Sequence, residues 1–369
     1  MRAGRGIRDR ARAGPEHGAD VFDADGRLRP GSDFSSTVVS VGPPAGWRRR
    51  AAAALEGLTR YPQPRGKGLD GLLERALGLA RGSVLVANGA SEALEWCARL
   101  AQGRRARLVA PCFGEYRAKL ERSDALVDEA WWDGRTPLEP ETLLKGLGRG
   151  DQLWFANPSN PFGSVAPPPE VDRLQAACRA RGVLLVLDEA LMAQRLDGLA
   201  DPGAYPGDPA HPCLAVVRSL GKGLGLPGLR LGYLAAEPGL AARHARFQDP
   251  WSVNALAQGL GAWAFSEEIA AAGRRRRILA LRSQDLLRRL SAPAARVRAE
   301  SPGATGYFCV HLGGPFAGRV AGRLATRGMF VRDCSSYGGW GRYWLRLNPR
   351  TPAENQALAR AVAATLAPA

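Results

Sequence analysis

The sequence predicts an α/β protein, with a large domain built on a mostly parallel sheet covered by helices and a smaller α+β domain at the C-terminus. Short apolar runs at residues 83–88, 153–156 and 183–187 alternate with helical patterns. Strands that are apolar on both faces and separated by helices are typical of a parallel sheet covered on both sides. After about residue 250 this alternation stops, and a long helical stretch precedes further strands and helices. The change of pattern indicates the second domain.

The length fits this organisation. At roughly 150 residues per domain, 369 residues suffice for two domains. We expect residues 1–45 to form an N-terminal arm, because their first part is rich in Arg, Gly and Asp and has little periodicity. The large domain is then expected over residues 46–248 and the small domain over residues 249–369.

Local patterns predict the individual elements in order. Recurring Ala and Leu predict helices over residues 47–58 and 69–79, and the run Tyr61-Pro-Gln-Pro separates them. In the large domain we expect strands over residues 83–88, 107–110, 153–156, 183–187, 214–217 and 231–234, and helices over 89–100 and 169–180. In the small domain we expect helices over 251–290, 316–326 and 352–366, and strands over 306–311, 329–332 and 343–347.

The excess of basic over acidic residues does not indicate that the protein binds nucleic acid. The chain has 51 Lys and Arg against 35 Asp and Glu, a formal charge of +16, but only four of the 51 are lysines. We attribute the excess of arginine to a general Arg/Gly/Ala/Pro bias, and we find neither a recognition motif nor a basic stripe with aromatics. A basic surface can still attract small anionic molecules.

Cysteine and histidine are too scattered for a metal site. The six cysteines form no CxxC pair, and the four histidines form no HExxH motif. We therefore expect no metal. The first 20 residues lack the apolar region of a secretory signal, and no run of 18 apolar residues occurs. We expect a protein of the reducing cytoplasm.

Lys222 is the most informative residue. It lies in the glycine-rich run Gly221-Lys-Gly-Leu-Gly just after an expected buried strand. Desolvation there would lower the pKa of the amine and let it form a Schiff base. Ser219 and Arg230 flank it and could hold a phosphate. The alternative, a surface lysine in a loop, is disfavoured because arginine replaces lysine almost everywhere else.

Asp188 ends an apolar strand, which would place its carboxylate at the carboxyl edge of the sheet, where ligands of open α/β sheets bind. A buried carboxylate needs a cationic partner, and a protonated pyridine nitrogen is one. The alternative is an aspartate that caps the next helix.

Two polar turns are further candidates for the site, at residues 88–92 and 157–163. The first precedes a helix whose N–H groups could bind phosphate, and the second could be a plain Pro-rich loop.

Five motifs occur in a characteristic order. They are Asn-Gly-Ala-Ser-Glu at 88–92, Pro-Cys-Phe at 111–113, Asn-Pro-x-Asn-Pro at 157–161, Asp-Glu at 188–189, and Ser-x-x-Lys with a later Arg-x-Gly at 219–232. In this order the chain resembles the fold type I pyridoxal-phosphate enzymes of the class I/II aminotransferase family. The resemblance covers essentially residues 33–365, and the motifs are specific in combination.

The resemblance implies how the cofactor, pyridoxal 5′-phosphate, would be held. Lys222 would bond covalently to it and move protons, and Asp188 would pair with its pyridine nitrogen. Asn157 would bind its phenolic oxygen, and Phe113 would stack on its ring. The residues implied at its phosphate are Ala90, Ser91, Ser219 and Arg230. Tyr61 would reach the phosphate in a neighbouring subunit, so a homodimer is expected.

Further motifs are similar to those of one branch of the family, the threonine-phosphate decarboxylases of cobalamin synthesis. They are His17-Gly18, the run 250–258, and the run 331–337 followed by 343–346. Arg346 would bind the substrate α-carboxylate. Two arginines facing one pocket suit a substrate with a carboxylate and a phosphate, so Arg332 is expected at the phosphate, with a surface ion pair as the alternative. His17 is the third expected substrate residue, with an arm histidine as its alternative.

The resemblance implies decarboxylation of L-threonine O-3-phosphate to (R)-1-amino-2-propanol O-phosphate. Two features depart from the family pattern. Residues 36–42 replace an Asn-x-Asn-Pro-x-Gly segment, and Leu191 stands where aminotransferases carry a tyrosine. The alternatives are a histidinol-phosphate-type aminotransferase, a basic nucleic-acid-binding protein and a regulatory relative without catalysis. The presence of both Lys222 and Asp188 argues against the last.

Overall fold

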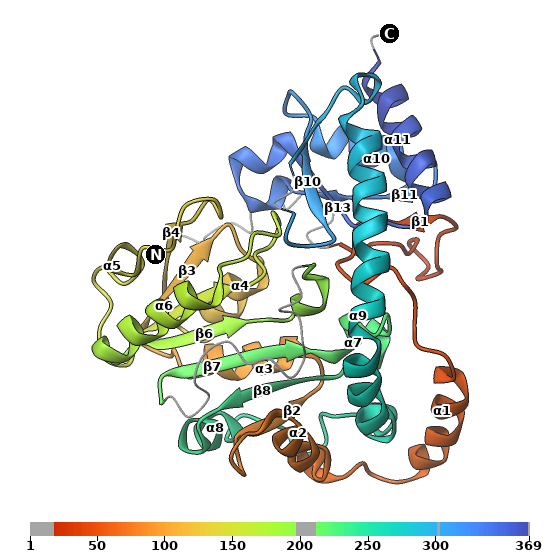
Figure 1. Ribbon diagram of the computed structural model, residues 1–369. Coiled ribbons are helices and arrows are strands. Elements are labelled where there is room, and N and C mark those ends of the chain that lie inside the picture. Colours follow the sequence, from red (N-terminus) through yellow and green to blue (C-terminus); the bar gives the residue numbers. More distant parts are fainter. Residues whose placement is uncertain (1–17, 197–211, 301–302, 368–369) are drawn as a thin grey trace, which may run out of the picture.

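A computed structural model describes residues 18–196, 212–300 and 303–367, and one long helix packs against both of its larger sheets (Figure 1). The strands of the larger sheet are β2 Val84–Ala87, β3 Arg105–Ala110, β4 Leu126–Trp131, β5 Gln152–Ala156, β6 Leu184–Asp188, β7 Leu214–Ser219 and β8 Gly232–Ala236. Their order is β2-β8-β7-β6-β5-β3-β4. β4, β3, β5, β6 and β7 are parallel to one another, and β8 is antiparallel to β7 and β2. The expected mostly parallel sheet is confirmed.

Burial on both faces explains why the central strands are continuous apolar runs. In β5, Trp154 packs into the core on one face, whereas Leu153 and Phe155 pack into the core on the other. Helices α3 Ala90–Arg99, α4 Glu115–Arg122 and α8 Pro238–Ala245 cover the first face, and α5 Pro140–Leu143 and α6 Pro168–Arg181 cover the second. α2 Leu69–Leu77 packs beside β2 and β8. α7 Leu220–Gly223 follows β7 directly.

The second unit is an antiparallel sheet with its own core. Its strands are β9 Arg298–Glu300, β10 Phe308–His311, β12 Arg332–Asp333 and β13 Trp344–Leu347, in the order β12-β13-β10-β9. α10 Ala317–Ala325 and α11 Pro352–Leu366 cover it. α11 begins where the sequence requires it, because Thr351 and Glu354 form a capping box and Pro352 occupies the first helical position between them.

One helix of 37 residues, α9 Ala255–Ser291, packs against both units. Figure 1 shows it running from the larger sheet to α11. The expected domain boundary at residue 249 precedes this helix. Short 3₁₀ helices lie at Leu55–Thr59, Pro64–Gly66, Met192–Gln194, Pro227–Leu229, Pro293–Ala295, Ser335–Tyr337 and Gly339–Tyr343.

The described chain starts on the smaller unit and then crosses to the larger one. β1 Ser32–Asp33 pairs in parallel with β11 Met329–Phe330, and Phe34 is buried in the core of the smaller unit. The chain then runs to α1 Trp47–Ala54, which packs on α9. Residues 33–42 therefore connect the two units. In the described parts of the chain, no helix is both long and apolar enough to cross a membrane.

Candidate active site

A cavity of about 350 Å³ lies at the carboxyl ends of the parallel strands, between the two units. It brings together residues that lie far apart in the sequence. The expected site residues at this cavity are Ala90, Ser91, Phe113, Asp188, Ser219, Lys222, Arg230, Arg332 and Arg346. Asn157 and Tyr61 do not line it, and His17 lies outside the described residues.

The start of α3 forms an anion cradle. The N–H groups of Ala90 and Ser91 have no partner among the described residues, as is usual in the first turn of a helix. Gly89 precedes them with a φ of 80°, and a Cβ there would lie 2.6 Å from Arg230 Nη2. The Arg230 guanidinium therefore packs directly on the glycine backbone. Free N–H groups beside an arginine fit a phosphate.

Ser219 reaches the same cradle because two strands pair closely there. It is the last residue of β7 and lies opposite Gly232 of β8. A Cβ at Gly232 would lie 2.7 Å from the Ala90 nitrogen, so glycine is needed for β8 to pass the start of α3. The cradle thus combines α3, the end of β7 and the turn after α7.

Asp188 lies at the floor of the cavity, 9% exposed, and its carboxylate is held from two sides. Oδ1 accepts a hydrogen bond of 2.8 Å from the Ala190 N–H, and Oδ2 accepts one from the hydroxyl of Tyr116. Burial and the charge of Asp188 raise the pKa of Tyr116 well above its usual value, so the hydroxyl stays a donor. The carboxylate is thereby oriented for a cationic partner in the cavity.

Lys222 lies on α7 and lines the cavity. Burial lowers the pKa of its amine; Asp188 acts in the opposite direction, and the cations Arg346 and Arg230 lower the pKa further. The amine therefore becomes neutral more readily than a free lysine, as a nucleophile or proton acceptor requires.

Phe113 lines the cavity ahead of α4 and packs edge-on against Tyr116, with ring centroids 5.7 Å apart. Leu191, at the position of the aminotransferase tyrosine, lines it as well and offers no polar group to a ligand.

Asn157 is fully buried and holds its own loop. Its Oδ1 accepts from the Ala166 N–H at 3.0 Å and its Nδ2 donates to the Ala166 carbonyl at 3.1 Å. Asn160 of the same turn lines the cavity in its place. In this structure the Asn157 side chain therefore stabilises its own loop. Its expected contact with the phenolic oxygen of the cofactor stays a prediction.

Arg332 and Arg346 face each other directly across β12 and β13, and each is only 4% exposed. Arg346 donates through Nη1 to Asn160 Oδ1 and through Nη2 to the Ser35 carbonyl, both at 2.6 Å, and its buried Nε has no hydrogen-bond partner among the described residues. Arg332 donates to Ser336 Oγ at 2.6 Å and lies over the Tyr337 ring. Like charges directly opposite on a sheet destabilise it, so the pair fits an anionic ligand.

Tyr116, Asn160 and Tyr337 were not expected from the sequence. Asn160 Oδ1 accepts from both Arg346 and the Tyr337 hydroxyl, at 2.6 and 2.7 Å. Tyr116 had a usable signal, because it follows Phe113 by three residues and so shares its side of the chain. Asn160 lay within the quoted 157–163 turn, but its partners are more than 170 residues away.

These residues fit pyridoxal 5′-phosphate. The glycine-lined cradle at α3 with its free N–H groups would hold the phosphate, Asp188 would face the pyridine nitrogen, Phe113 would cover the ring and Lys222 would meet the aldehyde. The bound cofactor supplies an electron sink for a bond broken at Cα of an amino acid. Arg332 and Arg346 would orient the substrate, and Lys222 would hold or release a proton at Cα.

Comparisons with known proteins agree with this geometry. The family model "Aminotransferase class I and II" matches residues 33–362. The chain is 31% identical over 358 residues to a threonine-phosphate decarboxylase of Pseudomonas aeruginosa, covering 95% of this chain and 97% of the relative. It is 30% identical over 362 residues to histidinol-phosphate aminotransferase 2 of Ralstonia nicotianae, covering 91% and 89%. The crystal structure of L-threonine-O-3-phosphate decarboxylase from Porphyromonas gingivalis matches with a TM-score of 0.78 at 25% identity, covering 90% of this chain and 98% of that one.

The fold and the cavity therefore define a fold type I pyridoxal-phosphate enzyme. Its cofactor is pyridoxal 5′-phosphate, and its chemistry is that of a decarboxylase or an aminotransferase. The chain belongs to the class I and II aminotransferase family.

Tyr116→Phe is expected to lower kcat about tenfold with little change in KM. The variant keeps the ring but removes the hydroxyl that orients Asp188, and a hydrogen bond to a charged group is worth about 1.5–3 kcal/mol. The pH dependence of the cofactor absorbance should shift as well. Tyr307→Phe is the control, because it removes an equally buried hydroxyl that donates to the Ser159 carbonyl. Equal losses in both variants would show a general packing effect.

Proposed function

We propose that this enzyme decarboxylates L-threonine O-3-phosphate to (R)-1-amino-2-propanol O-phosphate, as a step of cobalamin synthesis. The observation that carries the proposal is the pair Arg332 and Arg346, which lie side by side on β12 and β13, buried, in one cavity with Lys222. A substrate with two anionic ends matches the two positive charges that this pair brings to the cavity. Phosphothreonine carries its carboxylate and its phosphate on neighbouring carbons, which suits two adjacent arginines.

Two further features support decarboxylation. Leu191, which lines the cavity, replaces the tyrosine that aminotransferases place near the phenolic oxygen, and it offers no polar group there. When carbon dioxide leaves Cα, a proton must take its place. Lys222 lines the cavity, and its lowered pKa lets it give up a proton readily. Similarity to relatives named threonine-phosphate decarboxylase supports the same choice.

A histidinol-phosphate-type aminotransferase is the second candidate. Relatives with that name are equally similar, at 30% and 31% identity. Histidinol phosphate carries a phosphate and no carboxylate, so that substrate presents one anionic end to the cavity, whereas phosphothreonine presents two.

The two candidates are separated by running both reactions on the holoenzyme. One assay contains O-phospho-L-threonine and follows carbon dioxide and the amino alcohol phosphate. The other contains histidinol phosphate with 2-oxoglutarate and follows glutamate. We expect the first reaction to have the higher kcat/KM. Glutamate formation with no carbon dioxide release would overturn the proposal in favour of the transaminase.

We also propose a homodimer in which Tyr61 reaches the neighbouring active site. Tyr61 is 84% exposed and packs against Trp251, which is 50% exposed, at a centroid distance of 5.3 Å. Leu55 and Leu58, nearby in sequence, are also exposed. An exposed apolar group of this kind fits an interface. Sedimentation should show a dimer. The Tyr61→Phe variant should retain the cofactor less well but should still sediment as a dimer.

Arg332 and Arg346 are expected to have separable effects. Arg346→Ala should impair every amino-acid substrate, because all carry an α-carboxylate. Arg332→Ala should impair phosphorylated substrates selectively and reduce their kcat/KM advantage over L-threonine at least about tenfold, since a charge-assisted bidentate contact is worth roughly 1.5–3 kcal/mol. Arg332→Lys should recover only part of this kcat/KM advantage, because lysine restores the charge but not the planar fork of the guanidinium. If Arg332→Ala lowers kcat/KM equally for both substrates, Arg332 has a structural role only.

A further inference from the structure

A short segment of the smaller unit, residues 335–340, holds the side chain of Arg332; it is here called the clasp. Ser336 Oγ accepts a hydrogen bond of 2.6 Å from Arg332 Nη2. The Tyr337 ring lies under the Arg332 guanidinium, whose carbon is 5.4 Å from the ring centroid. Arg332 and Tyr337 both line the cavity. The position of the guanidinium in the cavity therefore depends on where the clasp lies.

Trp340, the last residue of the clasp, contacts two aromatic rings of the larger unit. Its ring stacks on Phe162 at a centroid distance of 5.3 Å and an interplanar angle of 25°, and it meets Trp131 edge-on at 5.6 Å. Its centroid also lies 6.1 Å from that of Tyr337. Stacked and edge-on pairs at such distances are favourable geometries for aromatic rings. One ring therefore connects the larger unit to the residue that lies under Arg332.

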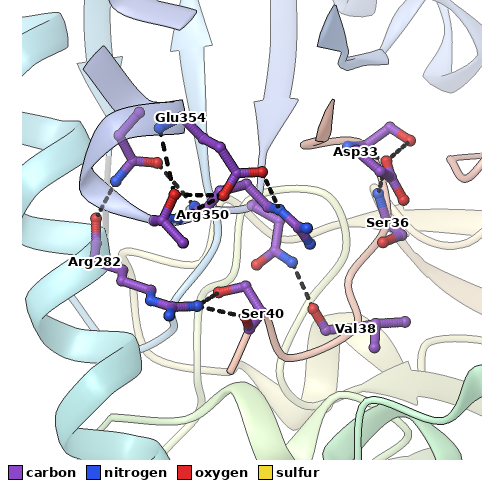
Figure 2. Close-up of polar contacts among 11 residues, drawn as sticks. Asp33, Ser36, Val38, Ser40, Arg282, Arg350 and Glu354 are labelled. Carbon is purple, nitrogen blue, oxygen red and sulfur yellow. Dashed lines mark hydrogen bonds and ion pairs between the residues drawn. The ribbon is translucent and has the colours of Figure 1, made fainter. Parts of the chain in front are cut away.

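These ring contacts lie at the edge of the larger sheet that is far from α9. α9 packs beside β2 and β8, whereas Trp131 ends β4, the strand at the opposite edge. On the α9 side the helix itself packs against both units, and its Arg282 donates to the Ser40 carbonyl (Figure 2). On the β4 side two hollows of about 530 and 630 Å³ lie between the units, and Trp131 lines both. The aromatic rings therefore cross a loosely packed part of the junction.

One turn of the larger unit, residues 157–163, holds both arginines of the cavity. Asn160 Oδ1 accepts a hydrogen bond of 2.6 Å from Arg346 Nη1, and Phe162 of the same turn contacts the clasp that holds Arg332. The two arginines lie directly opposite each other on β12 and β13. Like charges in that position repel. An anchor on the larger unit is therefore needed to keep Arg332 beside Arg346 before an anion binds.

We propose that Trp340 is a positioning residue that fixes Arg332 for the phosphate of the substrate. This inference rests on the proposed function, because it takes Arg332 to bind that phosphate. A binding group that is already fixed loses less conformational entropy when its ligand binds. Without the Trp340 ring, Ser336 and Tyr337 still contact Arg332, but the clasp is free to move away from the larger unit and to take the guanidinium with it.

Calorimetric titration of the holoenzyme tests the role of Trp340. The probes are isopropyl phosphate, which carries only the phosphate end of the substrate, and 3-hydroxybutyrate, which carries only the carboxylate end. Trp340→Ala should weaken the binding of isopropyl phosphate about fivefold, the order of one aromatic pair, and leave that of 3-hydroxybutyrate within about twofold. Trp340→Phe keeps a ring that can stack on Phe162, so it should restore most of the affinity. Equal losses for both probes, or no loss for isopropyl phosphate, would overturn the proposal.

Tyr343→Ala is the matched control. Tyr343 belongs to the same 3₁₀ helix as Trp340, but its ring stacks on His311 at 5.8 Å, a contact within the smaller unit. We expect it to leave both probes within about twofold. Trp131→Ala should weaken isopropyl phosphate as Trp340→Ala does, and it should add little in the double variant because its partner ring is already gone. Equal weakening by Tyr343→Ala and Trp340→Ala, or fully additive effects of Trp131→Ala and Trp340→Ala, would contradict the role of Trp340.

The wild type and Arg332→Ala keep this inference separate from the proposed function. If Arg332→Ala weakens isopropyl phosphate but the wild type releases no carbon dioxide from O-phospho-L-threonine, the proposed reaction fails and Trp340→Ala still decides the role of the clasp. If the wild type does not bind isopropyl phosphate, or Arg332→Ala binds it as tightly as the wild type does, the proposal for Trp340 is overturned, whatever reaction the enzyme catalyses.

Discussion

Lys222→Met is expected to abolish turnover of every substrate while the protein still folds. Methionine has a similar length but can neither bond to the cofactor aldehyde nor hold a proton. Proton transfer by a positioned side chain contributes about 10²–10⁴-fold, so kcat should fall by at least this factor. Borohydride reduction of the wild type, followed by peptide mapping, should place the pyridoxyl group on Lys222. A label on Lys67, Lys119 or Lys145 would refute the assignment.

The same substitution is expected to stabilise the cofactor-free protein near neutral pH. Burial lowers the pKa of Lys222 in the folded state, so the unfolded chain binds this proton more tightly. The resulting cost to stability is full below the folded pKa and disappears above the ordinary lysine value of about 10.4. The melting temperature of Lys222→Met should therefore exceed that of the wild type near neutral pH, and the gap should close as the pH rises toward about 10. A gap that widens with pH would contradict the buried, readily neutralised amine.

Asp188→Ala is expected to cause the second-largest loss of activity, after Lys222→Met. Its carboxylate is oriented by Tyr116 and the Ala190 N–H and would be the counter-ion of the pyridine nitrogen. Removing one partner of a buried pair costs about 3–5 kcal/mol, which corresponds to roughly 10²–10³-fold or more in kcat/KM at about 1.4 kcal/mol per tenfold. Steady-state kinetics at saturating cofactor measure this loss.

Glu189→Gln is the matched control for Asp188. Glu189 is the next residue, is fully buried and forms a 2.7 Å ion pair with Arg218, but it does not line the cavity. Its replacement should lower the melting temperature with a much smaller effect on kcat. Near-wild-type turnover in Asp188→Ala, or an equal loss in both variants, would remove the catalytic role of Asp188.

Strand predictions succeeded where both faces of a strand are buried. β5, β6 and β7 are continuous apolar runs because helices cover both sides of the sheet. β4 escaped prediction because it is an edge strand, and its Asp128 and Glu129 face solvent or charged neighbours. α4 escaped because it is short and mostly polar. In both cases the local pattern carries too little apolar signal.

The site was predictable where its residues follow strands and not where they depend on distant contacts. Lys222 and Asp188 stand at carboxyl ends of strands, so pattern alone placed them together at one edge of the sheet. The bond from Tyr116 to Asp188 joins residues 72 apart, and that from Asn348 to Val38 joins residues 310 apart. The first pairing is set by how α4 packs on the larger sheet, and the second by how the smaller unit meets the segment that leads to α1; local sequence encodes neither. Residues 36–42 were therefore noted only as a departure, although Ser36, Thr37 and Val38 of this range line the cavity.

The central claim, decarboxylation of a phosphorylated amino acid at this cavity, is tested most directly with O-phospho-L-threonine carrying ¹³C in its carboxylate. The holoenzyme is incubated without any 2-oxoacid, and labelled carbon dioxide and 1-amino-2-propanol O-phosphate are measured together by mass spectrometry. The account predicts that both form in equal amounts, that the reaction continues over many turnovers, and that Arg332→Ala slows it. A reaction that stops after one turnover, with the ¹³C retained in a 2-oxoacid, would contradict it.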